Sequence, residues 1–579
     1  MNQSKQQLEE AYFSHICSWI LQAKPTKRQL HEQKIKLCHQ YAVKRVPTDI
    51  EIYIRAPEQQ AIELKPYLQT KPGRTSSGVA VIATMSMPSL CPHGACTFCP
   101  GGLGSPYGDT PMSYTGTEPS TMRAKRNEYD PYRIIFNRLQ QFILLGQHPD
   151  KCEQIIQGGT FPSFSQEYQE HYVYYSFKAY NDFSRLFFDE KGLLRLEFFK
   201  EFFELPGSIK DTDRQQRIKE KILSVKEQNA TTTLEQEQVK NETTPIRCIG
   251  LTIETKPDWG LQEHGLEFLR LGATRVELGV QTIYDDILQS VNRGHTIEQT
   301  HQSVSELKDL CFKLNFHLMP GLPKTNGVRI ERERDIYAMR AIFEDENYRP
   351  DMIKIYPCMV MPGTPLEKTW KDGVFKPLTT QEAADIIVEI YRYVPEYCRI
   401  MRVQRDIPTF STTAGVDRTN LRQYVDKLAK ERSIVSRDIR AREIMRDHVY
   451  DQPTIVVRSF RANGADEFFI SMEANDRLFG FCRLRFAPRS LHPSIDEHTG
   501  LIRELHVYGV AVKIGDQDSE KVQHRGFGKQ LMQKAEEICQ EHNKKKVVVI
   551  SGVGVREYYR KIGYEREGPF MVKFLNTRD

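Results

Sequence analysis

The chain has 579 residues with a formal net charge of +5 at pH 7, and 39% of its residues are hydrophobic. This length exceeds the ~250–300 residues that one hydrophobic core usually supports, so we expect more than one domain. No apolar run approaches the ~20 residues of a membrane-spanning helix, and the N-terminus lacks the apolar stretch of a secretory signal. The 12 cysteines are scattered apart from one triplet. This usage is typical of a reducing compartment, so we predict a cytoplasmic protein without a membrane partner.

Two segments carry the excess of basic residues. Residues 1–75 contain 12 Lys and Arg against 7 Asp and Glu, and residues 402–446 contain 11 against 6. Basic clusters are the electrostatic footprint of proteins that bind a phosphate backbone, although a single charged helix is more often only a solvated face. Two separate segments in a nearly neutral chain favour RNA or DNA as a partner. The candidate contacts are Lys24, Lys27, Arg28, Arg402, Arg405, Arg437 and Arg440.

Three cysteines stand close together in the next part of the chain. Cys91, Cys96 and Cys99 lie five and three residues apart, and Gly101 and Gly102 follow them. Three thiolates on one short loop can hold three irons of a [4Fe–4S] cluster and leave the fourth iron open for a small molecule. A structural zinc usually has four protein ligands, but a zinc knuckle or a redox pair also fits Cys96 and Cys99 alone. The triplet by itself therefore leaves iron–sulfur and zinc open.

Short apolar runs alternate with helical patterns between residues 76 and 365. The runs are rich in Val, Ile and Leu, and they span 78–87, 152–161, 246–255, 274–282, 314–320 and 352–360. Helical patterns fall between them, at 130–146, 261–271, 284–314 and 333–344. This alternation predicts an α/β fold with a parallel sheet and right-handed crossovers, and six units predict a partial (β/α)6 barrel. In such barrels the chemistry lies at the carboxyl ends of the strands.

Residues 165–245 differ from their flanks, and we predict an insertion there. They begin with aromatic-rich sequence and end in the polar stretch 227–233, which has the composition of a flexible surface loop. The expected order of domains is a basic, mostly helical segment, the barrel with its insertion, a basic linker and a C-terminal domain. Their expected limits are 1–70, 71–400, 401–449 and 450–579.

Polar or glycine-containing motifs stand at five consecutive predicted strand ends. The cysteine loop follows the first strand, Gly158-Gly159 ends the second, Glu254 to Asp258 the third, Gly279 to Thr282 the fourth, and His317 to Pro323 the fifth. Glycines at such ends let the polar groups of a ligand approach the backbone. One such motif is ordinary turn chemistry, but five of them beside the cysteine triplet resemble the radical S-adenosylmethionine superfamily. The resemblance implies that Cys91, Cys96 and Cys99 hold a [4Fe–4S] cluster, that Gly158, Gly159, Glu254 and Gln281 bind S-adenosylmethionine, and that Lys256 is a candidate catalytic residue.

Residues 450–579 carry a different pattern. A strand at 501–510 precedes the turn 523–528, which contains Gly526 and Gly528 and opens a helical pattern at 529–541. Free backbone N–H groups at a glycine-rich turn before a helix suit a pyrophosphate, whereas the residues of a Walker loop or a Rossmann fingerprint are missing. With the strand 547–552 and Tyr558-Tyr559, the arrangement resembles the GNAT acetyltransferases; a strand–turn–helix without ligand is the alternative. Tyr558 either donates a proton to a leaving thiolate or packs the pantetheine arm. Tyr559 is the more natural packing residue, although the two roles can be exchanged.

Several longer segments resemble the family of Elongator catalytic subunits in its archaeal and bacterial stand-alone form. They span 71–78, 113–116, 158–161, 292–296, 402–408, 503–509 and 551–556. The family resemblance implies a tRNA-modifying enzyme that uses acetyl-CoA and S-adenosylmethionine radical chemistry to form 5-carboxymethyluridine at the wobble position, uridine 34. The anticodon stem-loop of tRNA is then the partner of the two basic segments. Accessory subunits or a second copy of the chain are left open.

The same resemblance implies further ligand contacts. It assigns acetyl-CoA to Lys151, Glu504, Leu505, His506, Val507, Gly526, Phe527, Gly528 and Tyr558. Members of the family also hold a structural zinc, for which Cys311, Cys358 and Cys398 are candidates here, but each is more simply a buried apolar residue and none is assigned. Ser436 stands where relatives carry Cys.

Two other functions are compatible with parts of the pattern. The C-terminal half alone allows a protein lysine acetyltransferase in which the iron–sulfur barrel has a structural role. A tRNA-binding scaffold without chemistry is the third reading. The complete cysteine triplet, the glycine turn and Tyr558 disfavour that scaffold, so the tRNA-modifying enzyme is the leading hypothesis.

Overall fold

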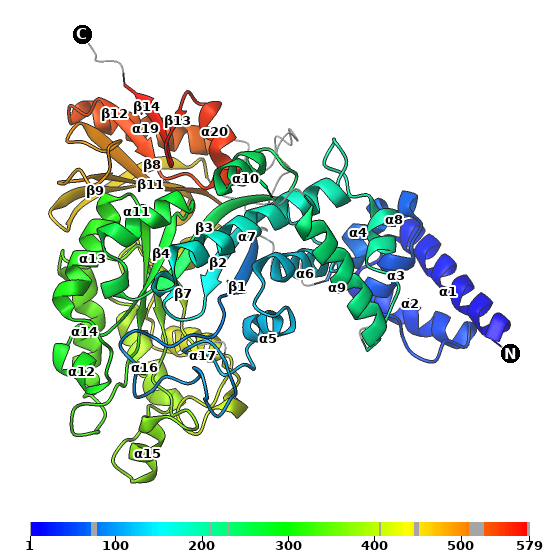
Figure 1. The fold of residues 1–579 in the computed structure, drawn as a ribbon, viewed down its shortest axis with the longest axis horizontal. Coiled ribbons are helices and arrows are strands. Elements are labelled where there is room, and N and C mark those ends of the chain that lie inside the picture. Colours follow the sequence, from blue (N-terminus) through cyan, green and yellow to red (C-terminus); the bar gives the residue numbers. More distant parts are fainter. Residues whose placement is uncertain are drawn as a thin grey trace. The chain divides into compact units, whose positions relative to one another are not determined.

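The computed structural model describes residues 2–70, 78–208, 210–228, 231–404, 407–444, 451–508 and 526–575 (Figure 1). The chain is divided into two compact structural units. Unit 1 comprises Met1–Ala80, Tyr132–Cys152 and Tyr174–Arg247, and unit 2 comprises Val81–Pro131, Glu153–Val173 and Cys248–Asp579. Among the helices of the described ranges, none combines the length and the apolar character needed to cross a bilayer.

Unit 1 is built from helices, as predicted for the N-terminal segment. Its first four helices enclose a core that includes Tyr12, Ile16, Leu37 and Ile52. The chain enters the second and third helices through capping boxes, in which a threonine accepts a hydrogen bond from the backbone three residues later. The four helices are α1 (Asn2–Ala23), α2 (Lys27–Gln40), α3 (Asp49–Arg55) and α4 (Glu58–Leu68).

The predicted insertion contributes most of its residues to unit 1 and is also helical. Tyr132 and Lys178 both donate to the buried carboxylate of Asp182, at 2.9 and 2.8 Å. The polar stretch lies between two of its helices; Thr233 caps the second of them, and residues 229 and 230 lie outside the described ranges. The helices of the insertion are α7 (Gln166–Phe187), α8 (Leu196–Phe202), α9 (Thr212–Glu227) and α10 (Leu234–Asn241), and α6 (Pro131–Leu144), which contains Tyr132, precedes the insertion in the chain.

The first sheet of the described structure has seven strands in the order of the chain, and its neighbours from β3 to β7 are parallel. This confirms the predicted partial barrel and adds one strand to the six expected. The added strand, β7, is short and reads Arg-Ile-Met-Arg, so no apolar run marks it in the sequence. The strands are β1 (Ala80–Met85), β2 (Lys151–Gln157), β3 (Arg247–Thr255), β4 (Arg275–Gln281), β5 (Lys313–Leu318), β6 (Met352–Ile355) and β7 (Arg399–Arg402).

Among the helical patterns predicted between the strands, one differs from the structure. The pattern at 284–314 is not one helix, because the chain leaves the helix after Ser290 and re-enters it at Ile297. Asn292 and Gly294 have φ of 52° and 76° between the two pieces, and Thr296 caps the second. The helices are α5 (Pro119–Arg126), α11 (Gln262–Arg270), α12 (Asp285–Ser290), α13 (Ile297–Asp309), α14 (Arg332–Glu344), α15 (Pro365–Lys371), α16 (Thr380–Ile390), α17 (Leu421–Glu431) and α18 (Ile439–Arg442).

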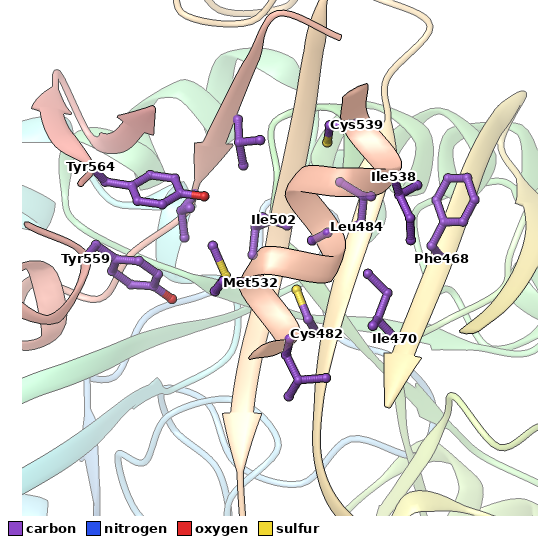
Figure 2. Packing of buried hydrophobic residues seen from close by; sticks show 14 of the residues in the cluster. Phe468, Ile470, Cys482, Leu484, Ile502, Met532, Ile538, Cys539, Tyr559 and Tyr564 are labelled. Carbon is purple, nitrogen blue, oxygen red and sulfur yellow. The ribbon is translucent and has the colours of Figure 1, made fainter. Parts of the chain in front are cut away.

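A second sheet forms the C-terminal part of unit 2, with the strand order β13-β14-β12-β11-β10-β9-β8. Only the β11–β12 pair is parallel among the pairs described. Helix α19 lies over this sheet, and its Met532, Ile538 and Cys539 pack against Leu484 and Ile502 of the strands (Figure 2). The elements are β8 (Thr454–Ala462), β9 (Ala465–Ala474), β10 (Arg477–Phe486), β11 (Thr499–Val507), α19 (Phe527–Glu541), β12 (Lys546–Val549), α20 (Arg556–Arg560), β13 (Glu565–Glu567) and β14 (Phe570–Phe574).

Within unit 2, the second sheet packs against the amino ends of the barrel strands through buried ion pairs. Arg503 of β11 donates to both carboxylate oxygens of Asp351, which directly precedes β6, at 2.6 and 2.7 Å. Lys313, the first residue of β5, lies 3.4 Å from Glu504 of β11. At Gly552 the backbones approach so closely that a Cβ atom would overlap the carbonyl oxygen of Ile249. Charge pairing and a missing side chain together fix this contact.

Candidate functional site

The cysteine loop lies at the carboxyl ends of the first two barrel strands. Cys91 Sγ is 3.9 Å from the hydroxyl of Thr160, which follows β2, and Cys99 Sγ is 3.4 Å from the hydroxyl of Ser113. Cys96 is 3% exposed. A hydroxyl group thus lies beside two of the three thiols, and burial raises the pKa of Cys91 against the hydrogen bond with Thr160.

The three thiols do not converge as ligands of a single ion in the described part of the chain. Among the described residues, only Glu254, Glu277 and His317 form a group of possible metal ligands whose atoms all lie within 4.8 Å of one another. The cysteines of one zinc ion would converge in this way, because each Zn–S bond is ~2.3 Å long. The cysteines of a [4Fe–4S] cluster bind separate irons and lie farther apart. The cluster on this loop therefore remains a prediction.

The glycine pair after β2 stands beside this loop. Gly158 and Gly159 have φ of 123° and 95°, which residues with side chains rarely adopt. A Cβ atom at Gly158 would overlap the hydroxyl of Ser86, and one at Gly159 would lie 4.0 Å from Cys91 Sγ. The pair thus lets the end of β2 pack closely against Ser86 and Met112 beside the first cysteine, and its contact with S-adenosylmethionine remains a prediction.

Glu254 and Gln281 end the third and fourth strands on the same edge of the sheet. Glu254 accepts hydrogen bonds from Tyr114 Oη at 3.2 Å and Gln157 Nε2 at 3.3 Å. Gln281 has the unusual φ of 68°, and its buried Oε1 has no hydrogen-bond partner within the described part of the chain. A buried acceptor without a partner is rare unless a ligand or water completes it. Gln281 thus fits a contact to a bound molecule.

Lys256 is buried beside the cysteine loop and is not exposed to solvent. Its side chain is 2% exposed, and its Nζ lies 2.8 Å from Asp258 Oδ2 and 3.1 Å from His93 Nδ1. Burial lowers the pKa of Lys256 from its ordinary value. The geometry gives this lysine a role in supporting the loop, and its predicted catalytic role stays a prediction.

A buried charge cluster inside the barrel was not anticipated from the sequence. Glu277 of β4 forms an ion pair with Lys354 of β6. Its carboxylate also accepts a hydrogen bond from Asn315 Nδ2 at 3.1 Å and lies 2.8 Å from His317 Nε2. The pKa of Glu277 is held well below its usual range, chiefly by the charge of Lys354 against the cost of burial. Because the ammonium of Lys354 already balances the carboxylate, this group needs no metal ion. Charged residues inside strand-like runs at 274–282 and 352–360 are the signal that could have indicated it.

The predicted coenzyme strand separates from its neighbour at one end. β11 pairs with β12 only over Thr499–Ile502, but it continues along β10 to Val507. In the described structure, the β12 side of the last five residues of β11 has no paired strand. Open strand edges of this kind can bind the amides of a pantetheine arm.

The turn before α19 and Tyr558 complete this candidate site. Gly526, with φ of 73°, begins the helix, and residues 523–525 lie outside the described ranges. A Cβ atom at Gly528 would lie 2.7 Å from Tyr558 Oη, so this hydroxyl lies directly over the first turn of α19. Tyr558 is 38% exposed, and burial of its remaining surface raises its pKa to about 12. The phenol is therefore protonated at neutral pH and can donate a proton.

Other predicted coenzyme residues have different surroundings. Tyr559 is buried in the hydrophobic core under α19 (Figure 2), which favours packing over catalysis. The carboxylate of Glu504 accepts from Arg483 Nε at 2.9 Å, and the ring of His506 stacks on Phe481. Contacts between the coenzyme and residues 504–507 would therefore be made by the backbone of these residues. Lys151 begins β2 and belongs to unit 1, and its predicted contact remains a prediction.

Several predicted RNA contacts already have acidic partners. Lys27 lies 2.6 Å from Asp49, Arg28 2.9 Å from Glu32, and Arg437 2.9 Å from Asp476. The remaining described members of the set are exposed, and Arg405 lies outside the described ranges; the exposed ones are Lys24, Arg402 and Arg440. RNA binding by the ion-paired residues would have to replace these partners.

The zinc candidates do not form a site in the described residues. Cys311, Cys358 and Cys398 are buried, and none of them joins a group of possible metal ligands within 4.8 Å. Cys311 Sγ lies 3.3 Å from the carbonyl oxygen of Ile502. Ser436 donates to Asp438 at 2.8 Å. Their environment is that of small core residues.

Four known families match successive parts of the chain. Residues 10–76 match the ELP3 N-terminal domain, 85–334 the Radical SAM superfamily, 350–431 the Radical_SAM C-terminal domain, and 438–564 the Acetyltransferase (GNAT) family. The predicted linker at 401–449 thus overlaps two of these regions, and it contains α17. Radical SAM and GNAT domains imply S-adenosylmethionine, a [4Fe–4S] cluster and acetyl-CoA in general.

Individual relatives match nearly the whole chain. A "tRNA uridine(34) acetyltransferase" of Methanocaldococcus jannaschii is 39% identical over 543 residues, which cover 91% of this chain and 90% of the relative. "Elongator complex protein 3" of Saccharomyces cerevisiae is 37% identical over 554 residues, 93% of this chain and 90% of the relative. The solved structure titled "The archaeal Methanocaldococcus infernus Elp3 with N-terminus deletion (1-46)" has a TM-score of 0.68 and 34% identity, and covers 86% of this chain and 100% of its own. The chain belongs to the family of tRNA uridine(34) acetyltransferases and Elongator complex protein 3.

Proposed function

We propose that this chain is a tRNA uridine(34) acetyltransferase that forms 5-carboxymethyluridine in the anticodon from acetyl-CoA and S-adenosylmethionine. The main support is that one structural unit carries both the loop of Cys91, Cys96 and Cys99 and the turn of Gly526 and Gly528 under Tyr558. Relatives with this name are 39% identical to the chain. The proposed partner is the anticodon stem-loop, bound through basic residues in the cytoplasm.

The barrel residues supply ligands and positioning in this proposal. The three cysteines would hold the cluster, and Gly158, Gly159, Glu254 and Gln281 would hold S-adenosylmethionine. When bound, the cluster and S-adenosylmethionine together supply one-electron chemistry that generates a carbon radical. The protein contributes by fixing the ligand and by excluding water at the carboxyl ends of the strands.

The second half supplies the acetyl donor. Backbone N–H groups at Gly526–Gly528 bind the pyrophosphate, the open edge of β11 binds the pantetheine, and Tyr558 donates a proton to the leaving thiolate. Lys313 and Glu504 place β11 at the amino ends of the barrel strands. The cysteine loop lies at their carboxyl ends. The candidate coenzyme strand and the cysteine loop thus lie toward opposite ends of the barrel strands.

Tyr558→Phe is expected to lower the rate of acetyl-CoA hydrolysis by roughly 10²–10⁴-fold, because it removes a positioned general acid. Coenzyme affinity should change little, since the aromatic ring remains. The measurement is release of free coenzyme A in the presence of tRNA, together with coenzyme binding by calorimetry. Tyr559→Phe distinguishes the roles of the two tyrosines. A large loss of hydrolysis in Tyr559→Phe, with normal turnover in Tyr558→Phe, would make Tyr559 the proton donor and Tyr558 the packing residue.

The proposal is tested by anaerobic reconstitution of the chain with iron and sulfide, followed by addition of a reductant, acetyl-CoA, S-adenosylmethionine and bulk tRNA. Nucleoside mass spectrometry should then detect 5-carboxymethyluridine, and omission of S-adenosylmethionine should remove the product. A protein lysine acetyltransferase would instead acetylate peptides without tRNA or S-adenosylmethionine. That result, combined with unmodified tRNA, would contradict the proposal.

A further inference from the structure

Cys96 differs from the other two cysteines in the side chains that approach its sulfur. His93 Nε2 lies 3.5 Å from Cys96 Sγ, and Arg293 Nη1 lies 3.8 Å from it. Cys91 and Cys99 are approached by the hydroxyls of Thr160 and Ser113 instead. Both neighbours of Cys96 carry nitrogen donors, and Cys96 is the most buried of the three.

The partner of the other ring nitrogen decides what His93 offers to this sulfur. Lys256 Nζ lies 3.1 Å from His93 Nδ1, and an ammonium group has three donors and no acceptor. His93 Nδ1 must therefore accept, which places the single ring proton on Nε2, facing Cys96. A doubly protonated ring would instead set an N–H of a cation against another cation at this distance. Lys256 is itself held by Asp258 at 2.8 Å and by the carbonyl oxygen of Gly294 at 3.4 Å.

The chain segment that interrupts the predicted helix at 284–314 keeps His93 in this orientation. Asn292 Nδ2 donates to the carbonyl oxygen of Ala95 at 3.0 Å, and the carbonyl oxygen of Val291 accepts from the N–H of Thr97 at 3.0 Å. Gly294 has φ of 76°, and a Cβ atom there would overlap the side chain of His93. Residues 291–294 therefore hold the cysteine loop by hydrogen bonds, and the missing side chain at Gly294 leaves room for the imidazole of His93.

We propose that His93 is a positioning residue for the iron–sulfur centre, in which Lys256 fixes the tautomer so that Nε2–H donates a hydrogen bond to the Cys96 thiolate. This inference rests on the proposed function, because it requires a cluster on the loop. Hydrogen bonds to cluster sulfurs favour the reduced, more negative state and raise the reduction potential. His93 thus makes the centre easier to reduce.

The test compares His93→Leu, which removes the donor, with His93→Gln, whose amide Nε2 can reach the same sulfur. Each reconstituted chain is titrated with a reductant under anaerobic conditions and followed by visible absorption and electron paramagnetic resonance, without S-adenosylmethionine or tRNA. We expect His93→Leu to keep its iron but to be reduced about tenfold less favourably, equal to about 59 mV for a one-electron couple. His93→Gln should recover most of this difference. His301→Leu, which changes a histidine of α13 packed on Tyr348, is the matched control and should titrate like the parent chain.

Three outcomes decide the inference. An unchanged potential in His93→Leu with full iron content would overturn it. If His93→Leu does not retain its iron, His93→Gln decides: a potential near that of the parent chain supports the donated hydrogen bond, and a clearly lower one refutes it. If the parent chain itself takes up no iron, the proposed function fails and the inference fails with it, while a negative result confined to the His93 variants leaves the proposed function intact.

Discussion

Cys96→Ala is expected to abolish the formation of 5-carboxymethyluridine and to leave acetyl-CoA binding unchanged. The substitution removes one of the three thiolates proposed to hold the cluster, and two thiolates would not retain it in the same form. The coenzyme site lies on a different sheet, whose contacts with the barrel are at the opposite strand ends. Iron content, nucleoside mass spectrometry and coenzyme calorimetry measure the three properties separately.

A second buried cysteine provides the control for Cys96→Ala. Cys96 and Cys358 belong to the same hydrophobic cluster, together with Phe98 and Met319. Cys358→Ala therefore removes a sulfur from the same packing environment without touching the loop, and it should keep both iron and product. Equal losses in the two variants would attribute the effect to packing. Normal product from Cys96→Ala would remove the cluster from the mechanism.

Much of the barrel could be predicted because its strands are apolar runs and its motifs are adjacent to them in the chain. Gly158 directly follows β2, Glu254 and Gln281 lie within the last two residues of β3 and β4, and parallel strands bring such ends to one edge. Strand β7 could not be found in this way, because four residues with two arginines form no apolar run. The break in the helical pattern at Asn292 and Gly294 could not be predicted either, because it allows a contact with the cysteine loop about 200 residues earlier.

The arrangement of side chains within the site could not be predicted from the sequence either, because it also depends on contacts between residues far apart in the chain. Lys256 and His93 are 163 residues apart, and Arg293 and Cys96 are 197 apart, so no local pattern connects them. Charged residues in strands are ordinarily read as exposed. Here Glu467 and Arg503 of the strands, and Asp351 directly before β6, are buried because the two sheets meet at these positions.

Arg503 lies at the centre of this buried network. Its guanidinium donates to Asp351 at 2.6 and 2.7 Å and to Glu467 Oε2 at 2.7 Å, and all three side chains are at most 3% exposed. Burial opposes the charged form of Glu467, but the neighbouring cations, Arg503 first among them, lower its pKa to about 2. Because this folded-state pKa is depressed, the stabilisation is present above the ordinary pKa near ~4.3 and is lost as the pH falls toward 2.

Arg503→Met is therefore expected to lower the free energy of unfolding by about 3–5 kcal/mol at neutral pH, because it leaves two buried carboxylates without their central cation. Arg489→Met is the matched control: Arg489 contacts Asp309 of the same network at 2.8 Å but is 39% exposed. Asp309 is buried but keeps its second partner, Arg485, so the loss of Arg489 at the partly exposed edge of the network should cost only about 1 kcal/mol. Urea unfolding of both variants at pH 7 and pH 4 provides the measurement, and the difference from the parent chain should shrink at the lower pH. Equal effects of the two substitutions would mean that the interface between the sheets depends on apolar packing, and that the buried charges only accompany it.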